Sequence, residues 1–197
     1  MEQQVAEAAL AMVRPTTDSA TRAAASNFLE QWTRMPGWNV YNKWLLSFHV
    51  NDDTLAEVVG TQLLCLTLLQ AKIRREVPRG TTNNASLRTI YNQLLTLTTD
   101  ASPSTMLRPL CVCTAALAVR CGDMQDLMSK CHSATSVTPL VALRILACLP
   151  PEVEACQDLT TPQVAETLWP YVEGVLDTVR RALAFSDTIQ PALEALQ

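Results

Sequence analysis

The chain has 197 residues, a net charge of −4 and a pI of about 5.2; 48% of its residues are apolar and 17% are charged. This length suffices for one large domain or two small ones with a sizeable core, and the apolar share excludes a disordered or collagen-like chain. A general nucleic-acid-binding protein usually carries a basic excess, which this chain lacks. We therefore expect a folded protein that does not bind nucleic acid directly.

Neither a secretory signal nor a membrane span is expected from the sequence. Residues 1–4 are acidic and polar, whereas a signal peptide begins with positive charge followed by an apolar stretch. The longest nearly apolar runs, 58–69 and 110–119, are shorter than the roughly 20 residues that a spanning helix needs.

Helical periodicity runs through nearly the whole chain, and the short alternating runs typical of strands are absent. Proline, glycine and short polar residues interrupt it at close intervals, which predicts helices joined by short loops. About nine helices are predicted, at 2–13, 18–34, 38–49, 54–77, 84–99, 104–121, 123–131, 137–149 and 162–184. A further turn at 152–159 and the start of a helix at 187–197 also fit the pattern.

Several residues mark predicted helix ends and bends. Asp18 and Asp53 are expected to be N-caps, because a short side-chain oxygen can accept a free backbone N–H. Pro162 and Pro109 fit the first turn of a helix. The backbone N–H that proline lacks has no partner within the helix there, so its absence costs no hydrogen bond. Pro170 falls inside the last predicted helix and should kink it.

The predicted helices form pairs that recur about every 40 residues, a spacing typical of HEAT-type repeats. This favours an all-α fold, a right-handed α-solenoid of HEAT-type antiparallel helix pairs with about four and a half repeats. Each pair would bury its apolar face against its neighbours. A closed bundle of the same helices is the alternative.

The helix predicted at 54–77 has two contrasting faces at 100° per residue. The face expected in the core carries Leu55, Val59, Leu66, Leu69, Ile73 and Val77. The opposite face carries Glu57, Thr61, Leu64, Leu68, Lys72 and Arg75. One interpretation is a helix buried on more than one side between its neighbours. The other is a mixed surface that receives a partner, because exposed apolar area rimmed by charge marks interaction sites.

Two further features concern packing. Helix 104–121 is apolar all round, which predicts that it lies between other helices rather than on a surface. Trp32, Trp38 and Trp44 are expected to fill the junction between the first and second helix pairs, and a partner pocket is the alternative.

The sequence contains no motif of the P-loop, dinucleotide-binding, zinc-protease or serine-hydrolase kind. His49 and His132 have no evident third partner for a triad, and the cysteines form no CxxC pair. The seven cysteines are expected to be reduced, unpaired core residues. We therefore expect no enzyme, no cofactor and no metal; a helical enzyme is a competing hypothesis without a catalytic constellation.

Five stretches between about residues 5 and 184 carry a family resemblance. They are FLEQW at 28–32 with GW at 37–38 and WLL at 44–46, KI at 72–73 with VP at 77–78, SLR at 86–88 with LL at 94–95, LCVCTAALAVRC at 110–121, and ILACLPPEV at 145–153. In this order they resemble the N-terminal region of importin-β-family nuclear transport receptors, and they are most similar to the transportin-SR and importin-13 subgroup.

The resemblance implies that 1–197 is an N-terminal HEAT-repeat arch of a longer receptor. Roughly 5–100 would correspond to the family's N-terminal region and roughly 101–197 to further exportin-like repeats. It implies a nuclear import receptor that shuttles between nucleus and cytoplasm and binds the small GTPase Ran in its GTP form. Protein cargo, in this subgroup including arginine-serine-rich splicing factors, would bind mainly to later repeats, and nucleoporin phenylalanine-glycine segments would dock between outer helices.

The resemblance also implies where Ran would bind. The inner helices would be 18–34, 54–77, 104–121 and 137–149, with their free faces on the concave side. The expected contacts are Glu57, Thr61, Leu64, Leu68, Lys72, Arg75, Arg108 and Val112, with Val119 following Val112 at helical spacing. The alternative function is a HEAT or armadillo scaffold or adaptor unrelated to nuclear transport.

Overall fold

The computed structural model describes residues 2–46, 56–78, 84–99, 104–132, 138–157 and 161–184, and all regular structure in these ranges is helical. The elements are α1 (Glu2–Val13), α2 (Ser19–Arg34), α3 (Asn39–Leu46), α4 (Ala56–Glu76), α5 (Ala85–Thr99), α6 (Ser104–Cys121), α7 (Met124–His132), α8 (Pro139–Ala147), α9 (Leu149–Gln157), α10 (Thr161–Leu168), the 3-10 helix η1 (Trp169–Tyr171) and α11 (Val172–Leu183). The predicted all-α fold is confirmed. Asp53 and the segment 187–197 lie outside the described residues.

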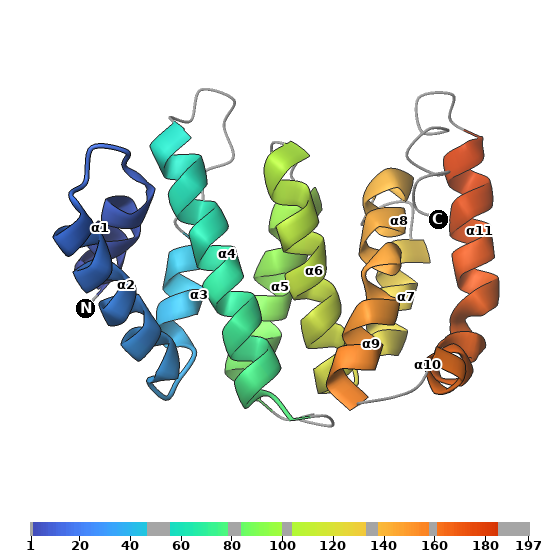
Figure 1. Cartoon of the computed structure of the whole chain (residues 1–197). Coiled ribbons are helices and arrows are strands. Elements are labelled where there is room, and N and C mark those ends of the chain that lie inside the picture. The colour runs from blue at the N-terminus through green and yellow to red at the C-terminus, as the bar shows by residue number, and fades with distance from the viewer. Residues whose placement is uncertain are drawn as a thin grey trace.

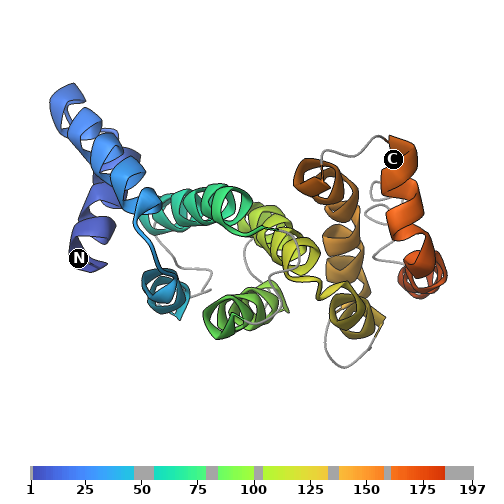
Figure 2. The same cartoon turned by 90° about the horizontal axis from the view of Figure 1, so that it is seen from below.

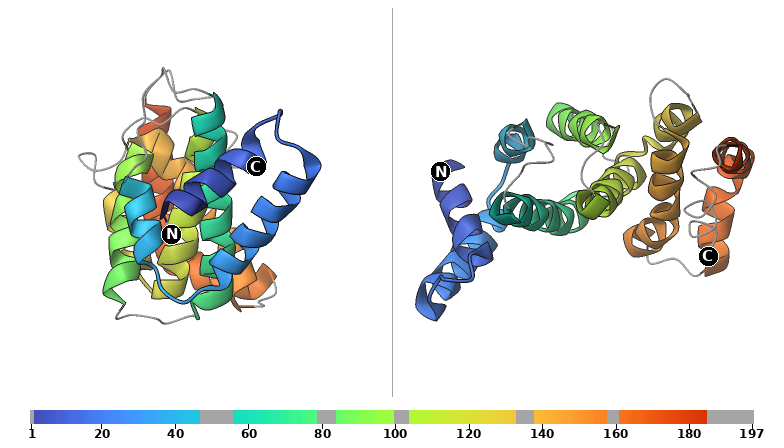
Figure 3. Two further views of the ribbon diagram at one scale, coloured as in Figure 1. Left: turned by 90° about the vertical axis from the view of Figure 1, so that its left-hand side faces the viewer. Right: turned by 90° about the horizontal axis from the view of Figure 1, so that it is seen from above.

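The helices stand side by side along one direction, from α1 and α2 at one end to α11 at the other (Figure 1). Seen from below, α4, α6 and α9 form one row, and α3, α5 and α7 form a second row beside it (Figure 2). The view from above in Figure 3 shows the same two rows. Helix α6 packs on α4 and α9 within its row and on α5 across the rows.

Helix α6 is the most enclosed element of the described chain. From Cys113 to Cys121 every side chain is buried, and the prediction of a helix between other helices is confirmed. Small residues such as Ala115, Ala116 and Ala118 allow neighbouring helices to approach α6 closely on several sides. Pro109 lies in the second turn of α6 rather than the first.

The local signals at helix ends behave largely as expected. The Asp18 carboxylate accepts a hydrogen bond from the backbone N–H of Thr21 at 2.9 Å, so this N-cap is confirmed. Pro162 lies in the first turn of α10. Pro170 breaks the last predicted helix, because η1 separates α10 from α11 and the two run in different directions (Figure 1). The predicted helix 137–149 ends at Ala147, and α9 begins two residues later.

The tryptophan cluster joins α2 to α3. Trp32 is buried, and its ring centroid lies 4.6 Å from that of Tyr41 and 5.6 Å from that of Trp44. Trp38 and Trp44 are partly buried and pack against the same core. The cluster is therefore core between the first two helix pairs, as predicted, rather than a partner pocket.

A buried ionic network connects three helices of the α4 row. Glu152 of α9 and Arg120 of α6 are both almost fully buried, and Arg120 Nη1 lies 3.2 Å from Glu152 Oε2. Arg74 of α4 donates to the same carboxylate. This hydrogen bond raises the pKa of Arg74. A buried carboxylate that accepts from two guanidinium groups fixes the relative positions of the helices that carry them.

One helix among the described residues, α4, is long and apolar enough to span a membrane by length and composition alone. A core helix of a soluble protein can have the same length and composition. Part of α4 is buried against α1, α2 and α6.

Replacing Glu152 with Gln should lower the free energy of unfolding by about 3–5 kcal/mol, because the change leaves the charge of buried Arg120 uncompensated. Urea denaturation of the wild type and the variant measures the difference. The matched control is Glu154→Gln, an exposed position on the same helix, which should change stability by less than about 0.5 kcal/mol. Equal stabilities of the two variants would contradict the structural role of Glu152.

Candidate partner-binding face

The candidate partner-binding face is the side of α4 and α6 that points away from α3 and α5. Helix α2 lies at one side of it and α8 with α9 at the other, so that α4 and α6 form its floor (Figure 2). Arg108 on α6 is exposed on its helix and Val112 is partly buried. Val119, predicted to continue this line, is buried.

The open side of α4 differs from the predicted one. Its exposed stripe runs through Thr67, Ala71 and Arg74, with Leu64 partly buried beside it. At 100° per residue, this stripe is rotated by roughly 90° from the face predicted for a partner. The buried side carries Gln62, Cys65, Leu66, Leu69, Lys72 and Ile73. This agrees with the interpretation that the helix is buried on more than one side.

Lys72 is fully buried, so the expectation that it lies on an open face is wrong. Its Nζ donates to the backbone carbonyls of Thr33 at 3.1 Å and Met35 at 2.6 Å, and lies 2.5 Å from a carboxylate oxygen of Glu76. It also lies 5.2 Å from the ring centroid of Trp38. The lysine thus binds carbonyls at the C-terminal end of α2, where a cation is favoured by the helix dipole.

Four of the predicted contacts lie on α4 before Lys72. Glu57 is partly buried and forms an ion pair with Arg14 of α1 at 3.0 Å. The Thr61 hydroxyl donates to the carbonyl oxygen of Glu57 at 2.8 Å. Leu64 and Leu68 are partly buried and pack against the core, so only part of each side chain is accessible.

Arg75 is exposed but already engaged. Its guanidinium donates to the Thr33 carbonyl oxygen and, at 2.7 Å, to the Glu76 carboxylate. Among the eight predicted contacts, the structure therefore leaves Arg108 exposed, Glu57 and Arg75 accessible but paired, and Lys72 enclosed.

The sequence prediction missed Thr67, Ala71 and Arg74, which form the stripe of α4 that solvent reaches. A signal for it was present, because Gly60, Thr67, Ala71 and Arg74 recur at helical spacing without one large apolar side chain. The prediction instead took the face opposite the large apolar residues as the open one.

The described residues do not assemble a cluster of metal-ligating side chains. No group of three or more His, Cys, Asp or Glu side chains there could hold a metal ion. His132 Nδ1 lies 3.3 Å from Asp177 at the surface, and His49 lies outside the described residues. Several acidic groups instead cap a helix or form ion pairs, as Asp18, Glu57 and Asp177 do.

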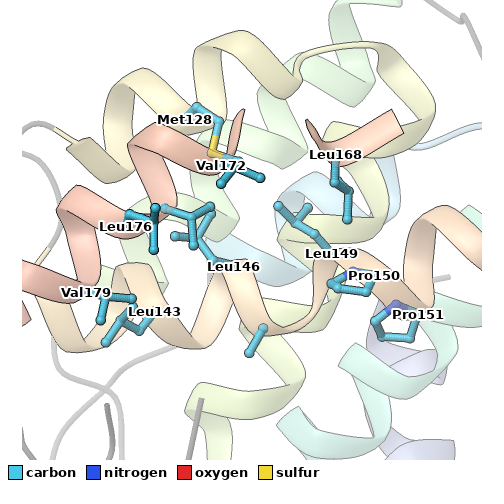
Figure 4. A pocket seen from close by; sticks show the side chains of 12 residues that line it. Met128, Leu143, Leu146, Leu149, Pro150, Pro151, Leu168, Val172, Leu176 and Val179 are labelled. Carbon is cyan, nitrogen blue, oxygen red and sulfur yellow. The ribbon is translucent and has the colours of Figure 1, made fainter. Parts of the chain in front are cut away.

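An apolar cavity of about 510 Å³ opens between α7 to α9 and α10 to α11 (Figure 4). All of its lining side chains are apolar, including Met128, Leu146, Leu168, Val172 and Leu176. Because no polar side chain lines it, the cavity lacks the side-chain groups that would orient a substrate.

Comparisons of the chain with protein-family models, with curated protein sequences and with solved structures give no match.

All seven cysteines are unpaired, as predicted. Burial raises the pKa of the Cys148 thiol to about 11 and that of Cys131 to about 12, and it raises the pKa of Cys65 as well. A thiol with a raised pKa has little reactive thiolate near neutral pH. The cysteines are therefore packing residues.

In the native protein at about pH 8, a thiol reagent should reach the partly buried Cys148 and Cys156 first, and the other five should react only after unfolding. Mass spectrometry of alkylated native and denatured samples distinguishes the two groups. Rapid native alkylation of Cys65 or Cys113 would contradict the described core.

Lys72→Met should lower the free energy of unfolding by about 1–3 kcal/mol, because the Met35 carbonyl loses the Lys72 donor and the Thr33 carbonyl keeps only Arg75. Denaturant unfolding provides the measurement. Arg88→Met is the matched control, since this side chain is 70% exposed and its ion partner lies 3.8 Å away. If Lys72→Met is as stable as the control, Lys72 does not secure the end of α2.

Proposed function

We propose that this chain is the N-terminal, Ran-GTP-binding region of a nuclear import receptor. In this proposal its helix pairs are HEAT-type repeats of an α-solenoid, and the chain is an N-terminal arch of a longer receptor. The role is binding rather than catalysis.

The observation that carries the proposal is the mixed surface on the floor formed by α4 and α6. There the exposed Thr67 and Ala71 lie beside the partly accessible Leu64, and Arg108 adds positive charge, whereas Arg74 is paired with Glu152. A small mixed patch edged by an arginine suits a GTPase surface that offers both apolar and acidic groups. The apolar centre would supply affinity, and the charges would supply orientation and association rate.

The sequence resemblance supports the further parts of the proposal. The receptor would shuttle between nucleus and cytoplasm, contact nucleoporin phenylalanine-glycine segments on its outer helices, and hold protein cargo mainly through repeats beyond this chain. Arginine-serine-rich splicing factors are the cargo class proposed for it.

A scaffold or adaptor unrelated to nuclear transport is the second candidate. One observation favours it: Glu57, Lys72 and Arg75, three of the expected Ran contacts, already make ion pairs within the chain. A scaffold of this kind has a partner other than Ran. Its binding would therefore not depend on whether Ran carries GTP or GDP.

Binding of Ran tests the first proposal. The chain should bind Ran loaded with GTP and should bind Ran loaded with GDP far more weakly. Arg108→Glu should weaken the GTP-dependent binding by about 1–3 kcal/mol, because it reverses an exposed charge on the proposed face. Isothermal titration calorimetry with both nucleotide forms gives the affinities.

Arg88→Glu is the control, because it makes the same charge change on α5 in the other row. Circular dichroism establishes that both variants are folded. Equal binding to the two nucleotide forms, or equal effects of the two charge reversals, would overturn the proposed Ran site.

A further inference from the structure

The seam between α6 and α8, two helices that pack on each other in the middle of the array, carries one arginine on each side. Arg108 of α6 is exposed and Arg144 of α8 is partly exposed. At 100° per residue, Arg108 lies about 60° from the exposed Thr105 and about 60° from the buried Cys111. Arg108 therefore stands at the edge of α6, between its open side and its packed side.

Two thiols place both arginines at this seam. Cys148, the C-cap of α8, is partly exposed, and Cys111 of α6 is buried. Burial raises the pKa of the Cys148 thiol to about 11, and the positive charge of Arg108 opposes that rise. Burial and the nearby Cys148 raise the pKa of Cys111, and the charge of Arg144 opposes that rise. Each arginine thus acts across the seam on a thiol of the opposite helix.

No carboxylate among the described residues neutralises these two charges. Neither α6 nor α8 contains an acidic residue, and neither arginine forms an ion pair or a side-chain hydrogen bond with another described residue. On the adjoining α9, Glu152 is taken by Arg74 and Arg120. The other glutamate of α9, Glu154, lies roughly 160° around the helix from Glu152 and so points away from α6.

The other cations of α4 and α6 already have partners. Lys72 and Arg75 pair with Glu76, and Arg74 and Arg120 pair with Glu152. The seam is therefore a local excess of positive charge in a chain whose net charge is −4. Such an excess favours a partner that brings negative charge.

We propose that the α6–α8 seam binds an acidic peptide segment of a partner protein. Arg108 and Arg144 each take one carboxylate of the segment, because a guanidinium group matches a carboxylate with two parallel hydrogen bonds. Val112 and Leu140 are partly exposed one turn from the two arginines and supply apolar contact beside them.

A peptide fits this seam better than a nucleic acid does. Binding to a phosphate backbone depends on many cationic contacts, and such proteins usually carry a basic excess. Here two arginines stand on an acidic chain.

The inference goes beyond the proposed function. Arg108 also belongs to the face proposed for Ran, whereas Arg144 lies on α8, beside that face. Binding of the acidic segment requires neither Ran nor a nucleotide. Peptide binding without Ran binding, or Ran binding without peptide binding, would therefore separate the two proposals.

Fluorescence anisotropy with a labelled peptide of alternating glutamate and serine tests the site in the absence of Ran. The wild type should bind this peptide and should not bind the matched peptide of lysine and serine. Arg108→Glu and Arg144→Glu should each raise the dissociation constant about tenfold, because each reversal places like charges opposite one another. Added salt should weaken the binding, because it screens exposed charges.

The Cys148 thiol reports the charge of the seam directly. Iodoacetate is an anion and iodoacetamide is neutral, so the ratio of their alkylation rates rises where the local potential is positive. This ratio should be higher at Cys148 than at Cys156, the other partly buried cysteine, and it should fall at Cys148 in both charge-reversal variants. Mass spectrometry of the alkylated protein gives both rates.

Arg88→Glu on α5 is the matched control, and it should change neither the peptide affinity nor the alkylation ratio at Cys148. Circular dichroism establishes that the variants are folded, and Arg144→Gln is a milder second variant that should also weaken the binding. The proposal would be overturned by any of four results: no peptide binding up to about 1 mM, equal effects of all three charge reversals, equal alkylation ratios at Cys148 and Cys156, or equally tight binding of single-stranded DNA of the same length.

Discussion

Burial of α6 is the constraint on which the rest of the structure depends. This helix packs against α4, α5, α8 and α9, and its C-terminal half has no side chain open to solvent. Such burial is possible because small residues, including Ala115, Ala116 and Ala118, alternate with larger apolar ones, so that several helices can approach at once. The two rows of helices meet at α6, and a bulky or charged residue in its C-terminal half would separate them.

Three buried charges, those of Lys72, Arg120 and Glu152, add specificity to this apolar packing. Glu152 accepts hydrogen bonds from Arg74 and Arg120 and so fixes α9 against α4 and α6. Lys72 fixes α4 against the end of α2. A buried charge is costly unless its partners are in place, so alternative packings of the same apolar helices would be penalised. The charged residues of the α4 row thus act mainly within the fold, and this narrows the surface left for a partner.

The surface that remains is divided between two places. The floor of α4 and α6 offers a small mixed patch near Arg108, which we propose for a GTPase. The exposed side of η1 and α11 offers an apolar stripe that includes Trp169, Leu176 and Leu183. The apolar cavity behind α11 borders this stripe through Leu176.

The sequence by itself determined the helices, because their periodicity, caps and breaks are local properties. Asp18 begins α2, Pro170 separates α10 from α11, and the uniformly apolar composition of α6 requires that it be enclosed. Only the tertiary structure decided which side of α4 is open. Lys72 is buried because carbonyl oxygens of Thr33 and Met35, distant in sequence, replace its water, and helical periodicity holds no information about such acceptors.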